Sequence, residues 1–183
     1  HMVIDVTEDG SNYYTLARTS GTYSATTKVC KWAMSDTSSP TACNTSNVKY
    51  GTALTYYDGE VFALQTYSST SYRKVIVLDA SDMTKETDFA YGNGVSAYSY
   101  TQDIDADEDG DGSLWISYRD YYGRIREYHR DAGGDYSASS YSQTYMYSRY
   151  HSSITVADDY VYTTGYYYSS YYGGIKRLST SGG

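Results

Sequence analysis

The residues best suited to chemistry lie in an acidic stretch at 103–112, with the sequence DIDADEDGDG. Carboxylate oxygens are ligands that Ca²⁺ prefers, and carboxylates at alternate positions followed by glycine resemble the loops that bind it. A twelve-residue calcium loop ends in a bidentate carboxylate, but Ile116 or Tyr118 occupies that place here, depending on the register. The stretch is therefore either an optional calcium site or a solvated turn, and no other cofactor is expected. The candidate ligands are Asp105, Asp107, Asp109 and Asp111.

Tyrosines recur at a fixed spacing and form the candidate ligand-binding site. One series is Tyr50, Tyr100 and Tyr150, and a second is Tyr72, Tyr122 and Tyr172. A tyrosine side chain offers a flat apolar ring and a hydroxyl group, which suits sugar faces and protein surfaces alike. The alternative is that many of these rings are core or cross-strand neighbours, because tyrosine is favoured in strands.

Catalytic motifs are scarce. A nucleophile elbow, a glycine-rich phosphate loop and a His-Glu-x-x-His helix are all missing. The remaining enzyme alternative is a glycoside-cleaving site built from acidic residues such as Asp103, Asp105 or Asp158. His129 and His151 have no further ligand at zinc spacing. We therefore expect a protein without enzymatic activity.

The elements that must position these residues are short strands that repeat along the chain. In the third strand of each copy, Val29, Val75, Ile125 and Ile175 share one position. In the second strand, the shared residue is aromatic: Tyr14, Phe62, Trp115 and Tyr162. The first strand has Ile4, Ala53, Ile104 and Ile154, and it ends at Asp9-Gly10, Asp58-Gly59, Asp109-Gly110 and Asp159-Tyr160. Asp-Gly at such a place indicates a hairpin turn.

The period of this repeat is close to fifty residues. Ile4 and Ala53 are 49 apart, Ala53 and Ile104 are 51 apart, and Ile104 and Ile154 are 50 apart. Such a period with three or four strands per copy is typical of propeller blades. The chain therefore resembles the β-propeller superfamily, although no Trp-Asp or kelch signature assigns a particular family.

The resemblance implies an all-β fold, a four-bladed propeller whose last blade is incomplete. His1 and Met2 look like a cloning remnant, and residues 3–183 are expected to form a single propeller domain. The blades would cover about 3–51, 52–102, 103–151 and 152–183, and the last would lack its outer strand. A fragment of a longer propeller, or an oligomer that covers the open edge, is the alternative. In a propeller, the two tyrosine series would lie in loops at one end of the ring.

Composition and charge narrow the class of partner. Twenty-seven tyrosines and a single proline suit strands, and the net charge of -8 argues against nucleic acid. No apolar run is long enough for membrane insertion.

Cys30 and Cys43 would lie on neighbouring strands of the first blade, and we expect a disulfide between them. The alternative is two free thiols. A disulfide implies an oxidising compartment, so secretion or display on the cell surface is expected.

The tyrosines lead us to expect a non-enzymatic, lectin-like recognition or adhesin module that binds a cell-surface carbohydrate. A protein-binding or structural role in a surface fibre or oligomer is the first alternative, and a glycoside-cleaving propeller is the second.

Overall fold

The computed structural model describes residues 2–18, 27–66, 73–91, 100–107, 112–119, 125–131, 134–138, 150–166 and 173–180. Within these ranges every regular element is a β-strand, and there is no helix. The expectation of an all-β protein is confirmed. The chain divides into two compact units, His1–Asn93 and Gly94–Gly183.

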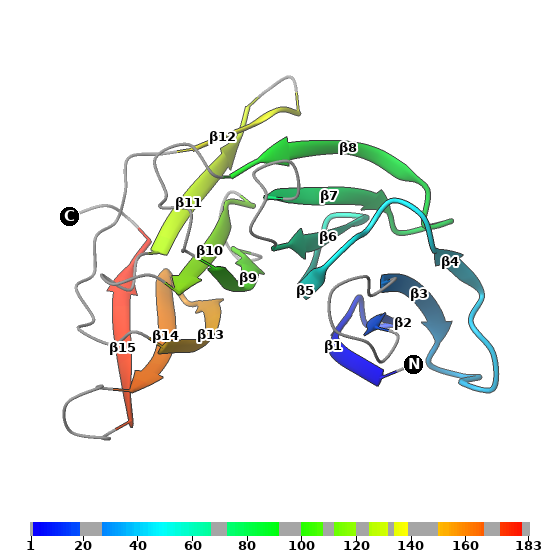
Figure 1. Cartoon of the computed structure of the whole chain (residues 1–183), viewed down its shortest axis with the longest axis horizontal. Coiled ribbons are helices and arrows are strands. Elements are labelled where there is room, and N and C mark those ends of the chain that lie inside the picture. Colours follow the sequence, from blue (N-terminus) through cyan, green and yellow to red (C-terminus); the bar gives the residue numbers. More distant parts are fainter. Residues whose placement is uncertain are drawn as a thin grey trace. The chain divides into compact units, whose positions relative to one another are not determined.

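The first unit contains two four-stranded antiparallel sheets, each with its strands in chain order (Figure 1). The first sheet consists of β1 (Met2–Glu8), β2 (Asn12–Arg18), β3 (Thr27–Ala33) and β4 (Ala42–Asn44). The second consists of β5 (Gly51–Tyr57), β6 (Glu60–Gln65), β7 (Lys74–Asp79) and β8 (Lys85–Ala90). Met2 pairs with Arg18, so strand β1 already includes this residue.

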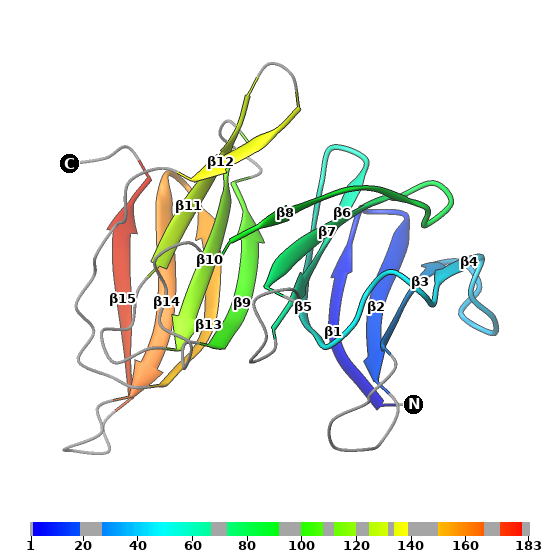
Figure 2. The same cartoon turned by 45° about the horizontal axis from the view of Figure 1, so that its top comes forward.

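The second unit repeats the arrangement (Figure 2). The third sheet consists of β9 (Tyr100–Ala106), β10 (Leu114–Arg119), β11 (Ile125–Arg130) and β12 (Tyr136–Ala138). The fourth consists of β13 (Tyr150–Ala157), β14 (Tyr160–Tyr166) and β15 (Gly173–Ser179). In the part of the chain that is described, this last sheet has three strands.

The tight turns between the first two strands follow from residues that accept positive φ angles. Asp58 and Gly59 have φ angles of 46° and 84° and connect the paired residues Tyr57 and Glu60. Two central residues with positive φ are what a type I′ hairpin requires.

The corresponding turn in the last sheet lies one residue earlier than the sequence repeat indicated. It is formed by Asp158 and Asp159, with φ angles of 52° and 63°, and not by Asp159-Tyr160. Tyr160 is instead the first residue of β14 and pairs with Ala157. Aspartate tolerates the left-handed region better than most residues, so the turn forms here without glycine.

The core of each unit lies between its two sheets. In the first unit, Tyr14, Leu16 and Val29 pack against Val61, Ala63, Ile76 and Leu78. In the second unit, Trp115 and Ile125 pack with Ile154 and Val161, and the half-buried Val156 and Leu178 join them. The apolar positions of the repeat therefore face a neighbouring sheet, as alternation along a strand predicts.

One repeat position differs between sheets. Val29, Val75 and Ile125 are fully buried, whereas Ile175 in β15 is 75% exposed. The other large apolar side chains that are exposed in the described chain lie on β1 and β2: Met2, Val3, Val6 and Tyr13. The first and last sheets thus each expose apolar side chains.

Candidate functional site

Each sheet has one edge at which its first strand begins and its second strand ends. The strand pairs at this edge are Met2–Arg18, Gly51–Gln65, Tyr100–Arg119 and Tyr150–Tyr166. Tyr50 immediately precedes β5, and Tyr100 and Tyr150 begin β9 and β13. We call this end of the strands the tyrosine edge of a sheet.

The second tyrosine series belongs to the connections between second and third strands. Tyr72, Tyr122 and Tyr172 themselves lie outside the described residues, but the flanking strands are described. In each pair of flanking strands, the first strand ends and the second begins at the tyrosine edge. The pairs are β6 and β7, β10 and β11, and β14 and β15. In each of these three sheets, the start of the first strand and the ends that flank this connection therefore lie at the same end, and the placement of the tyrosines around a ring stays a prediction.

In the second unit, two carboxylates join the first strands of neighbouring sheets. The backbone N–H of Ile154 donates to Asp103 Oδ2 at 2.9 Å, and that of Val156 donates to Asp105 Oδ2 at 2.8 Å. The Thr155 hydroxyl also donates to Asp105, at 3.1 Å. The carboxylates and their partners follow the same order along the chain, so β9 and β13 run in the same direction. Their tyrosine edges therefore lie at the same end of this unit.

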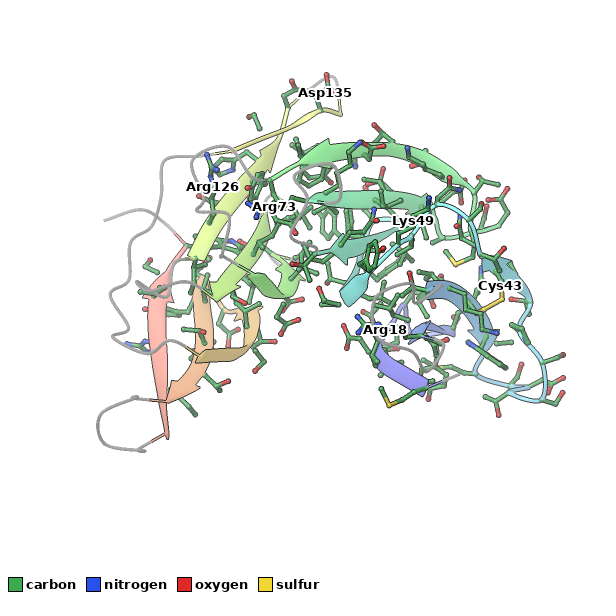
Figure 3. The ribbon with its side chains drawn as sticks, in the orientation of Figure 1. Arg18, Cys43, Lys49, Arg73, Arg126 and Asp135 are labelled. Carbon is green, nitrogen blue, oxygen red and sulfur yellow. A yellow bond between two sulfur atoms is a disulfide. The ribbon has the colours of Figure 1, made fainter. Side chains whose placement is uncertain are left out.

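The first unit is joined in a similar way. The backbone N–H of Leu54 donates to Asp5 Oδ2 at 2.6 Å, which connects β5 to β1. The Arg18 guanidinium, labelled in Figure 3, donates to the carbonyl of Gly51 at 2.8 Å. Because Arg18 pairs with Met2, the starts of β1 and β5 lie at the same end of this unit.

Tyr50 is held in an unusual backbone conformation at this edge. Its φ angle is 54°, in the left-handed region that bulky residues rarely adopt. The backbone N–H of Thr66 donates to the Tyr50 carbonyl at 3.1 Å, and the preceding Lys49 N–H donates to the Gln65 side chain at 2.9 Å. These hydrogen bonds hold the backbone of the half-buried Tyr50 in a conformation that would otherwise be rare.

The acidic stretch is only partly described, because Asp109 and Asp111 lie outside the described residues. Asp105 accepts hydrogen bonds from β13, and Asp107 is 7% exposed, with its backbone N–H bonded to the Ser113 carbonyl at 2.9 Å. Among the described residues, no group of three acidic, histidine or cysteine side chains is placed to hold a metal. The calcium site stays a prediction.

The half-buried Asp9 and the buried Tyr14 form a pair with a structural role. The Tyr14 hydroxyl donates to Asp9 Oδ2 at 2.6 Å. Burial alone would raise the pKa of Asp9, but hydrogen bonds from Tyr14, Asn12 and Ser11 lower it to about 2. Burial and the bond to Asp9 raise the pKa of Tyr14 well above its usual value. Asp9 therefore stays ionised and Tyr14 stays a neutral donor near neutral pH.

A chain of polar contacts among serine, histidine and glutamate was missed by the sequence analysis. Ser113 Oγ lies 2.8 Å from His129 Nδ1, and His129 Nε2 lies 3.2 Å from Glu127 Oε2. Glu127 and His129 are two residues apart on β11 and so share a face. The two-residue spacing of Glu127 and His129 was the available signal, whereas the position of Ser113 opposite His129 depends on the register of β10 and β11.

The predicted disulfide between Cys30 and Cys43 is confirmed (Figure 3). The two residues are direct partners in the ladder between β3 and β4. The bond is compatible with an extracellular location. Within the described ranges, the fold offers no helix with the length and apolar character needed to cross a membrane.

No protein-family model matches the sequence, and no curated protein matches it either.

Proposed function

We propose that the chain is a four-bladed β-propeller that binds a cell-surface carbohydrate through its tyrosine edge, outside the cell. The observation that carries the proposal is the placement of the tyrosines. In each unit, the first strands of both sheets begin at one end, and Tyr50, Tyr100 and Tyr150 lie at those starts. Tyrosines that lie at one end of neighbouring sheets offer an aromatic surface suited to sugar rings.

Exposed apolar side chains support the closure of the ring. Ile175 is 75% exposed, although Val29, Val75 and Ile125 occupy the same position in the other sheets and are fully buried. The first sheet exposes Val6 and Tyr13, at 55% and 39%. Packing another sheet against such a face would remove its apolar surface from water, which is favourable.

The same surface also favours a second candidate, in which a neighbouring molecule covers the last sheet in a fibre or oligomer. Molar mass in solution distinguishes the two, because a closed ring is a monomer of 20.5 kDa. A ring also protects the β15 amides from hydrogen exchange at all protein concentrations. An oligomer protects these amides only at protein concentrations at which it assembles.

The disulfide supports the proposed extracellular location. A Cys30–Cys43 bond between neighbouring strands is stable in an oxidising environment, where cell-surface recognition modules act. A net charge of -8 disfavours nucleic acid as a partner and leaves neutral glycans or proteins as suitable ligands.

A glycan-array screen with and without a calcium chelator tests the function. We expect selective binding to a small group of glycans. If binding is lost on chelation, the predicted ligands Asp105, Asp107, Asp109 and Asp111 form a calcium site that supports it. An array without selective binding would contradict the carbohydrate proposal, and a protein partner would replace it.

A further inference from the structure

Ser113, His129 and Glu127 form a chain of close polar contacts at the edge of the third sheet opposite its tyrosine edge. Ser113 immediately precedes β10, and Leu114 and Tyr128 are paired, so Ser113 lies across from His129. Its Oγ lies 2.8 Å from His129 Nδ1. Glu127 Oε2 lies 3.2 Å from the other ring nitrogen, Nε2.

The carboxylate determines which nitrogen can act as a base. With its proton on Nε2, neutral His129 donates to Glu127 and leaves Nδ1 free of a proton, so Nδ1 accepts the Ser113 O–H. A hydroxyl bonded to a base that a third group orients is the arrangement of an activated nucleophile. Here the base and the residue that orients it lie on strand β11, and the serine directly precedes the neighbouring strand β10.

We propose that Ser113 is the nucleophile of an esterase site, with His129 as its general base and Glu127 as the residue that positions His129. Ser113 Oγ attacks the carbonyl carbon of an ester while its proton passes to His129 Nδ1. The bond from the carbonyl carbon to the alkoxy oxygen breaks, and the leaving alcohol takes that proton. Water then attacks the acyl-serine while its proton passes to His129 Nδ1. The bond from the carbonyl carbon to Ser113 Oγ breaks, His129 returns the proton to Oγ, and the acid is released.

Burial limits the size of the substrate. Ser113 is 1% exposed, whereas the His129 side chain is 44% exposed and that of Glu127 is 15% exposed. Because Ser113 is this enclosed, we restrict the proposed substrate class to esters of acetate or a similarly short acid. The site lies at the edge away from the tyrosines and does not depend on carbohydrate binding.

Ser137 provides a matched control. It pairs with His129 in the ladder between β11 and β12, so it is the cross-strand neighbour of His129 on the other side. It is exposed to solvent, whereas Ser113 is buried. Reactivity caused by exposure alone would therefore favour Ser137, and reactivity caused by activation would favour Ser113.

The experiment uses p-nitrophenyl acetate and the full chain. We expect release of p-nitrophenolate, acetylation of Ser113 identified by peptide mass spectrometry, and a fall in kcat/KM of about 100-fold or more in Ser113→Ala and His129→Asn. Ser137→Ala should retain wild-type activity. In Glu127→Gln, kcat should fall with little change in KM. Glu127→Asp should recover part of the lost kcat.

Labelling of the unmodified protein keeps the test decisive even if a variant does not fold. A small fluorophosphonate should attach to Ser113 of the folded wild type, with loss of fluoride, and should not attach after unfolding in urea. Acetylation confined to lysine, tyrosine or Ser137, or wild-type activity in a folded Ser113→Ala, would overturn the proposal.

Discussion

Replacing Asp103 by asparagine should weaken the contact between the two sheets of the second unit. The carboxylate accepts two backbone N–H groups: that of Ile104 at Oδ1, at 3.0 Å, and that of Ile154 at Oδ2, at 2.9 Å. Asparagine has only one acceptor oxygen, so one of these N–H groups would face an amide NH₂. Ile154 is 5% exposed, and water cannot easily replace the lost partner.

The expected cost follows from these two bonds. A hydrogen bond to a charged group contributes about 1.5–3 kcal/mol, and a buried donor without a partner costs about 1–3 kcal/mol. We therefore expect the free energy of unfolding of the second unit to fall by about 2 kcal/mol in Asp103→Asn.

The two tryptophans allow the units to be followed separately. Trp115 is buried in the core of the second unit and Trp32 lies in the first. In a Trp32→Phe background, urea unfolding followed by fluorescence reports on Trp115 alone. Asp131→Asn is the control, because Asp131 is exposed and its carboxylate accepts the Asp135 N–H within one turn, at 3.0 Å.

The control variant should change stability by less than about 0.5 kcal/mol. If Asp103→Asn were as stable as Asp131→Asn, the carboxylate would not join the two sheets, and the reasoning about neighbouring parallel strands would be refuted.

Three further predictions concern the first unit. The pKa of Asp9 is about 2, below its usual 3.8, so its ionised form adds stability that is present above about pH 4 and is lost as the pH falls towards 2. Tyr14→Phe removes a bond that lowers this pKa, so the variant should lose less stability over that range in acid unfolding. Cys43→Ser opens a disulfide whose cysteines are 13 residues apart and should cost about 3 kcal/mol in urea unfolding. Gly51→Ala should cost about 1–3 kcal/mol, because its added methyl group would lie 2.8 Å from a buried leucine, whereas Gly174→Ala meets no atom and should be close to neutral in thermal melts.

Each of these has a clear contrary result. Equal acid sensitivity in wild type and Tyr14→Phe would show that the hydrogen bond does not hold the Asp9 pKa down. A Cys43→Ser variant as stable as wild type would remove the structural role of the disulfide. Similar melting temperatures for the two alanine variants would show that the first unit is loosely packed around Gly51.

The repeat made much of the fold predictable from sequence. Val29, Val75 and Ile125 share one position, and all three are buried as the alternation along a strand requires. Asp58-Gly59 was predictable as a turn because both residue types accept the positive φ angles of a tight hairpin. Cys30 and Cys43 could be paired because they fall on neighbouring strands. These features depend on local chemistry or on a period that the sequence displays.

The contacts that depend on tertiary neighbours could not be predicted. Asp103 and Asp105 stood out as members of an acidic run with possible metal-binding or catalytic roles, and nothing local indicates that their partners are backbone groups 51 residues away. Ile175 fits its repeat position by type, yet its exposure depends on what lies beside the last sheet. The pairing of Ser113 with His129 required the register of two strands, which the sequence repeat does not determine to one residue.

The central claim is that tyrosines at one edge of the sheets bind carbohydrate. It is tested most directly by comparing two triple alanine variants against a glycan selected from the array. The first variant replaces Tyr50, Tyr100 and Tyr150 at the tyrosine edge. The second replaces Tyr13, Tyr57 and Tyr160, which lie at the opposite ends of their strands.

We expect the first variant to lose at least about tenfold in affinity, because aromatic anchors dominate such surfaces, and the second to bind like wild type. Both should retain the wild-type circular dichroism spectrum. Equal affinity in the two folded variants would contradict the account, because the site would then lie away from the tyrosine edge.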